Sequence, residues 1–383
     1  MRMLHLIYYL SISFILPAQK FEEILAEVKS LPVHERQAHF DEYIKRQTKF
    51  PIIEGAQVVF LTKSDNGQPY LQADFNGFLN PRYTENKSIG LMKPIEGTSW
   101  YYYRKELVPD AVINYLYEDE SGVSVDSLNS NTRTNFGTEV SFLSLGETQE
   151  VIPSTPEEQR GKLATIEIES EFQNHTRTVH IYTPFNYEST EELPSVYFHD
   201  GSFFIGDMQV PEMLDYLISN QLIQPVVAVF DNPVIRGKEY RGDSAYIGYI
   251  EQELVPYITK NYKVSKAKDD RAVIGFSRGG MSAFYLAYFT TTFSKLGALS
   301  PAIHPTPVDD FMSQLNQSTS SPQQAFITGA IYDHLWYKDA VSLYEKLKQN
   351  EVEVQYIENS QGHNIPSWQT QLDDMLIAFF KIE

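Results

Sequence analysis

The sequence predicts an α/β fold, in which a mostly parallel sheet with helices on both faces follows a small β-sandwich. Two observations support this prediction. After residue 161, nearly continuous apolar runs alternate with helical segments, which is typical of parallel strands buried on both sides. Between residues 50 and 145, shorter β-rich runs are separated by turn sequences such as Asn76-Gly77, which is typical of antiparallel strands.

Composition restricts the classes of function. The chain has 383 residues, which favours two domains over one, and its 42% hydrophobic and 21% charged residues are ordinary for a globular protein. A net charge of −19 and the lack of a Lys/Arg-rich run argue against a nucleic-acid partner. The absence of cysteine excludes disulfides, a thiolate nucleophile and cysteine-based metal sites. We expect neither a metal nor an organic cofactor.

The first 18 residues have the pattern of a secretory signal peptide. Arg2 gives a cationic start, residues 4–16 are mostly apolar, and the segment ends at the small residue Ala18. No later segment approaches the roughly 20 apolar residues that a membrane span requires. The sequence therefore predicts a periplasmic or secreted protein with no stable membrane insertion after signal cleavage.

Four further segments follow. Residues 19–49 are expected to form helices, because apolar residues recur three or four apart on both sides of Pro32. Residues 50–145 form the predicted β-sandwich. We expect its aromatic residues to pack in the core, and the alternative is that they form a surface that binds a ligand. Residues 146–160 are rich in Glu, Pro, Ser and Gln and are predicted to be a linker. Residues 161–383 form the second domain, which opens with two antiparallel strands at 164–169 and 176–183.

A glycine-flanked serine lies between an apolar run and a helical segment. The sequence Gly275-Phe276-Ser277-Arg278-Gly279 follows the run 272–274 and precedes the helical stretch 281–288. This is the strand, turn and helix context of a nucleophile elbow, in which glycines allow a sharp turn that presents the serine hydroxyl at the edge of the sheet. The pattern predicts the α/β-hydrolase fold, with Ser277 as the catalytic nucleophile.

A serine hydroxyl needs a base, and in this fold the acid and the histidine follow the serine in that order. Asp333 comes after the apolar run 325–327, and His363 comes after the run 352–357 with Gly362 before it. We predict that His363 is the general base and that Asp333 orients its ring. Asp339 and Glu358 are alternative acids.

Backbone N–H groups must stabilise the oxyanion that forms during acyl transfer. One is expected from Arg278, the residue after the nucleophile, and another from Gly201 or Ser202, which follow the apolar run 195–198. We expect His199 and Asp200 to stabilise this loop through side-chain hydrogen bonds rather than to take part in catalysis.

Three aromatic residues lie close in sequence to these motifs, and they line the predicted acyl pocket or else pack in the core. They are Phe203, Phe204 and Trp368.

These motifs resemble those of the enterochelin-esterase-like esterases of the α/β-hydrolase superfamily, whose relatives include feruloyl and acetyl xylan esterases. The resemblance is carried by His199-Asp200-Gly201, by Asp231-Asn232-Pro233 with Arg236 and Glu239, by residues 251–257 and 275–280, and by Gly362-His363-Asn364 with Trp368. More weakly, residues 74–78 and 97–100 resemble the immunoglobulin-like early-set module of that family. The resemblance implies an ester hydrolase with a Ser277, Asp333 and His363 triad.

Several alternatives remain open at this stage. The substrate is a small-molecule or glycan-linked ester, of the siderophore-lactone or the plant-polysaccharide (feruloyl or acetyl) type. The Arg278 side chain attracts an anionic acyl group or pairs with a neighbouring acid. A peptidase or an acyltransferase could use the same triad, and a ligand-binding protein with a non-catalytic hydrolase scaffold is the alternative from another class. Sequence alone assigns no oligomeric state.

Overall fold

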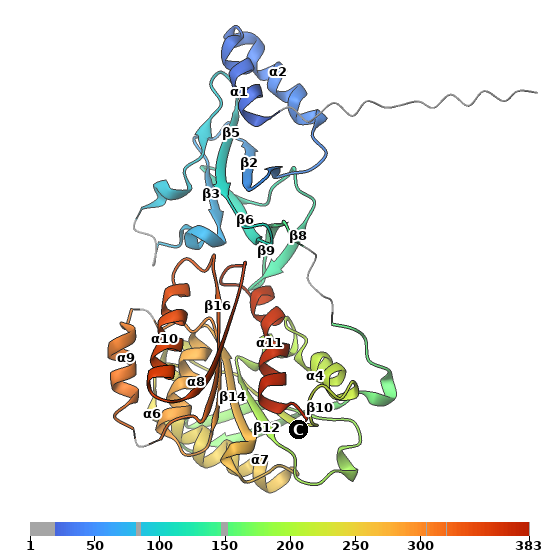
Figure 1. Cartoon of the computed structure of the whole chain (residues 1–383), viewed down its shortest axis with the longest axis vertical. Coiled ribbons are helices and arrows are strands. Elements are labelled where there is room, and N and C mark those ends of the chain that lie inside the picture. The colour runs from blue at the N-terminus through green and yellow to red at the C-terminus, as the bar shows by residue number, and fades with distance from the viewer. Residues whose placement is uncertain (1–19, 82–85, 147–151, 304, 319, 383) are drawn as a thin grey trace, which may run out of the picture.

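The computed structural model describes residues 20–81, 86–146, 152–303, 305–318 and 320–382 (Figure 1). The predicted signal peptide, residues 1–18, lies outside the described residues, and so do residues 147–151 of the predicted linker. Among the residues that are described, none of the helices has both the length and the apolar character needed to cross a membrane.

The described part of the chain opens with two helices that pack on the first sheet. α1 (Phe21–Ser30) and α2 (Val33–Arg46) are separated at Pro32. Their apolar sides share a buried cluster with the strands that follow, in which Phe40 lies 5.9 Å from the ring of Trp100. The helices therefore cover one face of the first sheet.

Residues 52–144 form two antiparallel sheets. One has the order β1-β2-β5-β4 and the other the order β3-β6-β9-β8, with β7 paired to β6. A shared core that includes Phe60, Leu71 and Ile113 joins them face to face. The elements are β1 (Ile52–Glu54), β2 (Gln57–Lys63), β3 (Tyr70–Ala73), η1 (Asp74–Leu79), η2 (Lys87–Gly90), β4 (Lys93–Pro94), β5 (Trp100–Glu106), β6 (Val112–Asp119), β7 (Gly122–Ser124), β8 (Thr132–Asn135) and β9 (Thr138–Ser144).

The rest of the chain is built on an eight-stranded sheet of order β10-β11-β13-β12-β14-β15-β16-β17. β10 and β11 are antiparallel, β11 pairs antiparallel with β13, and all the other pairs are parallel. The central strands are buried along their whole length, as their apolar runs predict. The strands are β10 (Lys162–Ser170), β11 (His175–Thr183), β12 (Ser195–His199), β13 (Val227–Asp231), β14 (Arg271–Phe276), β15 (Lys295–Leu299), β16 (Gln324–Ala330) and β17 (Glu353–Asn359).

Helices cover both faces of this sheet. One face packs against α6 (Ser244–Gly248), η5 (Tyr249–Leu254), α7 (Val255–Asn261), α8 (Arg278–Phe289), α9 (Val308–Leu315) and α10 (Tyr337–Gln349). The other packs against α3 (Gly201–Ile205), α4 (Val210–Ser219) and α11 (Ile365–Phe380). The short elements η3 (Glu157–Gln159), η4 (Tyr187–Ser189), α5 (Arg236–Glu239) and η6 (Lys268–Asp270) lie in the connections. This is the arrangement expected of an α/β-hydrolase.

The antiparallel domain stands on the carboxyl end of the large sheet (Figure 1). The N–H of Val112 donates to the carbonyl of Ser360 at 2.9 Å, just after β17 ends. The N–H of Val108 donates to the hydroxyl of Tyr332 at 2.9 Å, just after β16 ends. The two domains therefore meet at the sheet edge where the predicted acid and base lie.

Candidate active site

Ser277 occupies a strained turn between β14 and α8. Its φ of 52° and ψ of −123° are unfavourable for a residue with a Cβ. A Cβ on Gly275 would overlap the backbone of Gly279, so the turn can close only with glycine there. The turn is held by hydrogen bonds from Ser277 N–H to Leu299 O at 2.8 Å and from Ala302 N–H to Ser277 O at 2.9 Å.

His363 links the serine to a buried carboxylate. Its Nε2 lies 2.8 Å from Ser277 Oγ, and its Nδ1 lies 2.7 Å from Asp333 Oδ2. A carboxylate only accepts hydrogen bonds, so Nδ1 carries the proton and Nε2 is free to accept the hydroxyl proton of Ser277. The imidazole is held between two indoles, with ring centroids 4.2 Å from Trp336 and 4.9 Å from Trp368.

Of the three candidate acids, Asp333 is the one that contacts the imidazole. Its other oxygen accepts the N–H of Trp336 at 3.2 Å, which fixes the carboxylate. Glu358 instead accepts hydroxyl hydrogen bonds from Tyr337 and Tyr356. Asp339 lies in the first turn of α10.

The loop after β12 was predicted to supply an oxyanion donor from Gly201 or Ser202. The N–H of Ser202 donates to Asn232 Oδ1 at 2.9 Å and is therefore engaged. Gly201 packs against the backbone of Phe230, where an added Cβ would lie 2.7 Å from the carbonyl carbon. These contacts favour the N–H of Gly201 as the donor, together with that of Arg278 at the start of α8.

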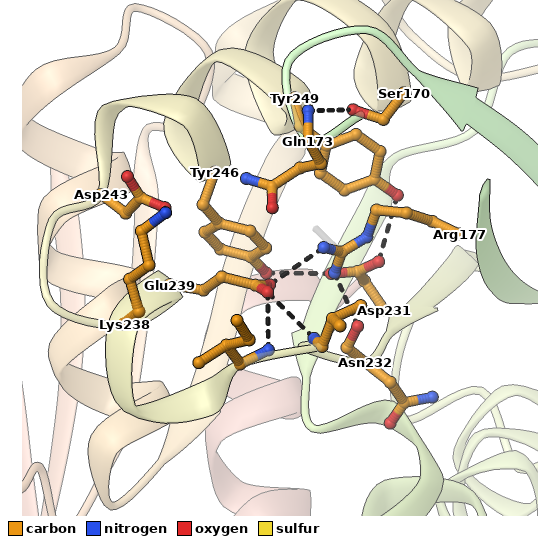
Figure 2. A network of polar contacts seen from close by, with 12 residues as sticks. Ser170, Gln173, Arg177, Asp231, Asn232, Lys238, Glu239, Asp243, Tyr246 and Tyr249 are labelled. Carbon is orange, nitrogen blue, oxygen red and sulfur yellow. Dashed lines mark hydrogen bonds and ion pairs between the residues drawn. The ribbon is translucent and has the colours of Figure 1, made fainter. Parts of the chain in front are cut away.

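A buried ionic network lies beneath this loop. Arg177 on β11 donates to Asp231 and to Glu239, each at 2.9 Å (Figure 2). Its side chain is almost fully buried. Arg177 also donates to the carbonyl of Asn232 at 2.6 Å, the residue whose side chain holds Ser202. The network therefore connects the core of the sheet to the candidate oxyanion loop.

His199 and Asp200 act as braces. Tyr246 donates its hydroxyl proton to Asp231 and so accepts from His199 Nδ1, both at 2.9 Å. Burial, with the nearby charges of Arg177 and Arg236, lowers the pKa of His199 to about 3, so this ring stays neutral. Asp200 forms a two-oxygen ion pair with Arg236.

The predicted aromatic pocket residues are only partly accessible. Phe203 is half-buried, whereas Phe204 and Trp368 are 0% exposed and belong to the core between the sheet and its helices. The prediction that Phe204 and Trp368 contact substrate is therefore corrected. The ring of Trp368 stacks on Phe276 at 4.5 Å and supports the site from behind.

An aromatic residue that sequence reasoning missed comes from the other domain. Phe136 and Gly137 form the two-residue turn between β8 and β9, and both have positive φ, 48° and 76°. A bulky residue is unfavourable at such a position. Phe136 is 44% exposed, and its ring lies 5.7 Å from Phe203 and 5.8 Å from Trp368.

A cavity of about 430 Å³ lies between the domains. Its walls include Phe78 and Phe136 from the antiparallel domain, and Asp333, Trp336 and His363 from the hydrolase domain. Throughout the described residues, no group of three His, Asp or Glu side chains is arranged to hold a metal ion. The cavity therefore places apolar surface beside His363, whose Nε2 contacts the hydroxyl of Ser277.

A known protein family matches part of the sequence that forms the large sheet and its helices. Residues 170–350 match the family Esterase, described as "Putative esterase". The expected resemblance to esterases thus agrees with this match over residues 170–350.

Solved structures with the same fold cover nearly the whole chain. The ferric enterobactin esterase of Salmonella typhimurium is 17% identical, with a TM-score of 0.70 over 88% of this chain and 98% of that one. The enterobactin esterase of Shigella flexneri, solved in the presence of enterobactin, is 18% identical, with a TM-score of 0.65 over 84% and 92%. At these identities the likeness establishes the fold.

Curated relatives match shorter segments. The uncharacterized protein YbbA of Bacillus subtilis is 27% identical over 149 residues, which are 34% of this chain and 59% of YbbA. Endo-1,4-beta-xylanase Y of Acetivibrio thermocellus is 22% identical over 129 residues, 30% of this chain and 12% of the xylanase. The chain thus spans less than two thirds of either relative.

Proposed function

We propose that this protein is a serine esterase that hydrolyses a carboxylic ester through an acyl-enzyme intermediate. The observation that carries the proposal is the continuous hydrogen-bond path from Ser277 Oγ through His363 to Asp333. The chain order of the three residues and their position at the carboxyl edge of the sheet are typical of α/β-hydrolases, and acyl transfer uses this hydrogen-bond path.

In the proposed reaction, Ser277 Oγ attacks the ester carbonyl while His363 Nε2 takes its proton. The negative charge on the carbonyl oxygen is stabilised by the N–H groups of Gly201 and Arg278. His363 then donates the proton to the alcohol as the ester bond breaks. Water then attacks the acyl-enzyme while His363 takes its proton, and His363 returns this proton to Ser277 Oγ as the acyl–oxygen bond breaks and the acid leaves. Asp333 stabilises the imidazolium in both halves.

We further propose an aromatic acyl group, as in siderophore-lactone or feruloyl esters. Phe136 and Phe203 offer accessible rings beside the site, and aromatic surfaces stack favourably on aromatic ligands. An acetyl group would leave most of a 430 Å³ cavity unfilled. The enterobactin esterase of Shigella flexneri was also solved in the presence of 2,3-di-hydroxy-N-benzoyl-glycine and of 2,3-di-hydroxy-N-benzoyl-serine, and the benzoyl rings of these ligands support this choice.

The proposal includes the remaining organisation of the chain. Residues 50–145 are proposed to be an immunoglobulin-like early-set module, 146–160 a linker and 161–383 the catalytic domain. Residues 1–18 are proposed to be a signal peptide, which directs the protein to the periplasm or outside the cell.

Covalent labelling tests the nucleophile. A fluorophosphonate probe is expected to label the full chain once, with the added mass on the peptide that contains Ser277, because the probe reacts only with an activated hydroxyl. The absence of label would favour a binding protein with an inactive scaffold. Peptide substrates and alcohol acceptors, tested in parallel, separate an esterase from a peptidase or an acyltransferase.

Replacing Phe136 with alanine tests the acyl group. The Phe136→Ala variant is expected to raise KM for a feruloyl ester about tenfold, since ring contacts contribute about 1–1.5 kcal/mol. KM for an acetyl ester should stay within about twofold. Phe172→Ala, at an exposed position in the turn after β10, is the matched control. Equal KM changes for both esters in Phe136→Ala would contradict an aromatic acyl group.

A further inference from the structure

The loop that carries His363 is held from the antiparallel domain on the side that precedes the histidine. Ser360 accepts the backbone N–H of Val112 and donates its hydroxyl to Asp110 Oδ1, both at 2.9 Å. Two independent contacts therefore fix the start of the loop to β6 and to the segment before it.

Asp74, at the start of η1, reaches the same loop after the histidine. Its Oδ2 accepts the N–H of Asn114 at 2.7 Å, and both its oxygens lie 3.2 Å from Asn364 Nδ2. The other end of the Asn364 amide is also fixed, because its Oδ1 accepts the N–H of Ser367 at 3.0 Å and caps α11. Asp74 thus orients the residue directly after His363.

Asp74 also packs against the residue directly before His363. A Cβ on Gly362 would overlap the carboxyl carbon of Asp74, so the carboxylate lies against the bare backbone of the loop. Glycine at 362 is explained by this close approach of the other domain. The same carboxylate therefore contacts both neighbours of His363.

The cost of burying Asp74 argues for a functional role. Its side chain is 3% exposed. Burial raises its pKa to about 6, and the N–H of Asn114 and the charge of Arg133 oppose this rise, while Asp333 adds to it. A neutral side chain would avoid the desolvation cost, and buried carboxylates of this kind are concentrated at functional sites.

The loop that carries Asp333 is also held by a contact from the antiparallel domain. Tyr332, which directly precedes Asp333, accepts the N–H of Val108 through its hydroxyl at 2.9 Å. Its own N–H donates to the carbonyl of Gln361 at 2.9 Å, which joins the two loops. Contacts from the antiparallel domain therefore reach the loops of both Asp333 and His363.

We propose that Asp74 is a positioning residue, through which the antiparallel domain holds His363 in line with Ser277. The hydrolase domain then depends on its neighbour for turnover as well as for the wall of the cavity. This inference rests on the proposed function, and it concerns how the imidazole is kept in place.

The Asp74→Asn variant tests the inference in the full chain. The amide keeps the size of the side chain but places an NH₂ group, which is a donor, against the donors Asn364 Nδ2 or the N–H of Asn114. The hydrogen bonds that hold the loop are therefore weakened. We expect kcat for a p-nitrophenyl ester to fall about 10- to 100-fold with KM within about threefold, because small displacements of a reacting group cost rate more than binding. Asp65→Asn, at an exposed position of the same domain, should keep wild-type values.

Hydrogen exchange at residues 359–364 supplies a readout that does not need turnover. Exchange there should be faster in Asp74→Asn than in wild type, while the central strands keep their protection. A folded Asp74→Asn variant with wild-type kcat, or with a change confined to KM, would overturn the inference. Wild-type protein that neither turns over the ester nor reacts with the fluorophosphonate would instead refute the proposed function, and the exchange result would still report on the loop.

If Asp74→Asn does not fold, a less disruptive variant, Tyr332→Phe, tests whether turnover depends on contacts from the antiparallel domain. Tyr332→Phe removes only the hydroxyl that accepts the Val108 N–H. We expect its kcat to fall about 3- to 10-fold at unchanged KM, because one brace of the acid loop is lost. Wild-type kcat in Tyr332→Phe would contradict the part of the inference in which turnover depends on contacts from the antiparallel domain.

Discussion

Ser277→Ala is expected to reduce kcat for a p-nitrophenyl ester by about 10⁶-fold, the scale seen when a triad serine is removed. The reason is geometric, since Ser277 Oγ is the atom that His363 Nε2 contacts at 2.8 Å. His363→Ala should cost about as much, and the double variant little more, because the two groups act as one unit. Initial rates at saturating substrate, with fluorophosphonate labelling, measure these effects.

The fold must survive for this result to be informative. Alanine at position 277 keeps the Cβ that the turn already accommodates, so the unfolding midpoint should change little. Ser189→Ala, at an exposed serine in η4, is the matched control and should keep full activity. Turnover within tenfold of wild type in a folded Ser277→Ala variant would contradict the assignment of the nucleophile.

How far the site could be predicted depends on the range of the interactions that form it. The turn at Ser277 is set by Gly275 and Gly279 within a few residues, so its sequence pattern is visible. Asp333 and His363 could be placed because parallel strands bring their carboxyl ends to one edge. Asp74 and Phe136 could not, since their contacts cross from another domain and leave no periodic pattern.

The errors among the aromatic residues have a related cause. Phe203 and Phe204 are adjacent in the short helix α3, where neighbouring side chains point in different directions. One of them therefore faces the site while the other packs on Phe198 at 4.6 Å in the core. Proximity in sequence to a motif does not specify whether a ring faces the site or packs in the core. The choice between Gly201 and Ser202 was likewise hidden, because it depends on the distant side chain of Asn232.

Arg177→Met is expected to lower the free energy of unfolding by about 3–5 kcal/mol, the cost of leaving buried charges without their partner. Asp231 and Glu239 are 3% and 2% exposed, so water cannot replace the guanidinium that contacts both. The free energy of unfolding of Arg177→Lys should lie between those of the wild type and Arg177→Met, because an ammonium group lacks the planar set of N–H donors that binds two carboxylates. Arg241→Met, at an exposed arginine, should stay within about 0.5 kcal/mol. Urea unfolding gives these values from the shift in midpoint at constant slope.

A triple variant separates an unpaired charge from lost packing. If the loss in Arg177→Met comes from the two carboxylates, adding Asp231→Asn and Glu239→Gln should restore more than half of it, because the buried charges are then removed together. If it comes from the lost contact of the guanidinium with Tyr249, whose ring centroid lies 4.4 Å from Arg177 Cζ, the triple variant should be no more stable than Arg177→Met. Activity should not recover in parallel, since Arg177 also holds the carbonyl of Asn232, whose side chain fixes Ser202 beside the candidate oxyanion donor. A triple variant that regains stability but not turnover would therefore show that the network stabilises the fold and, separately, positions the loop that contains Ser202.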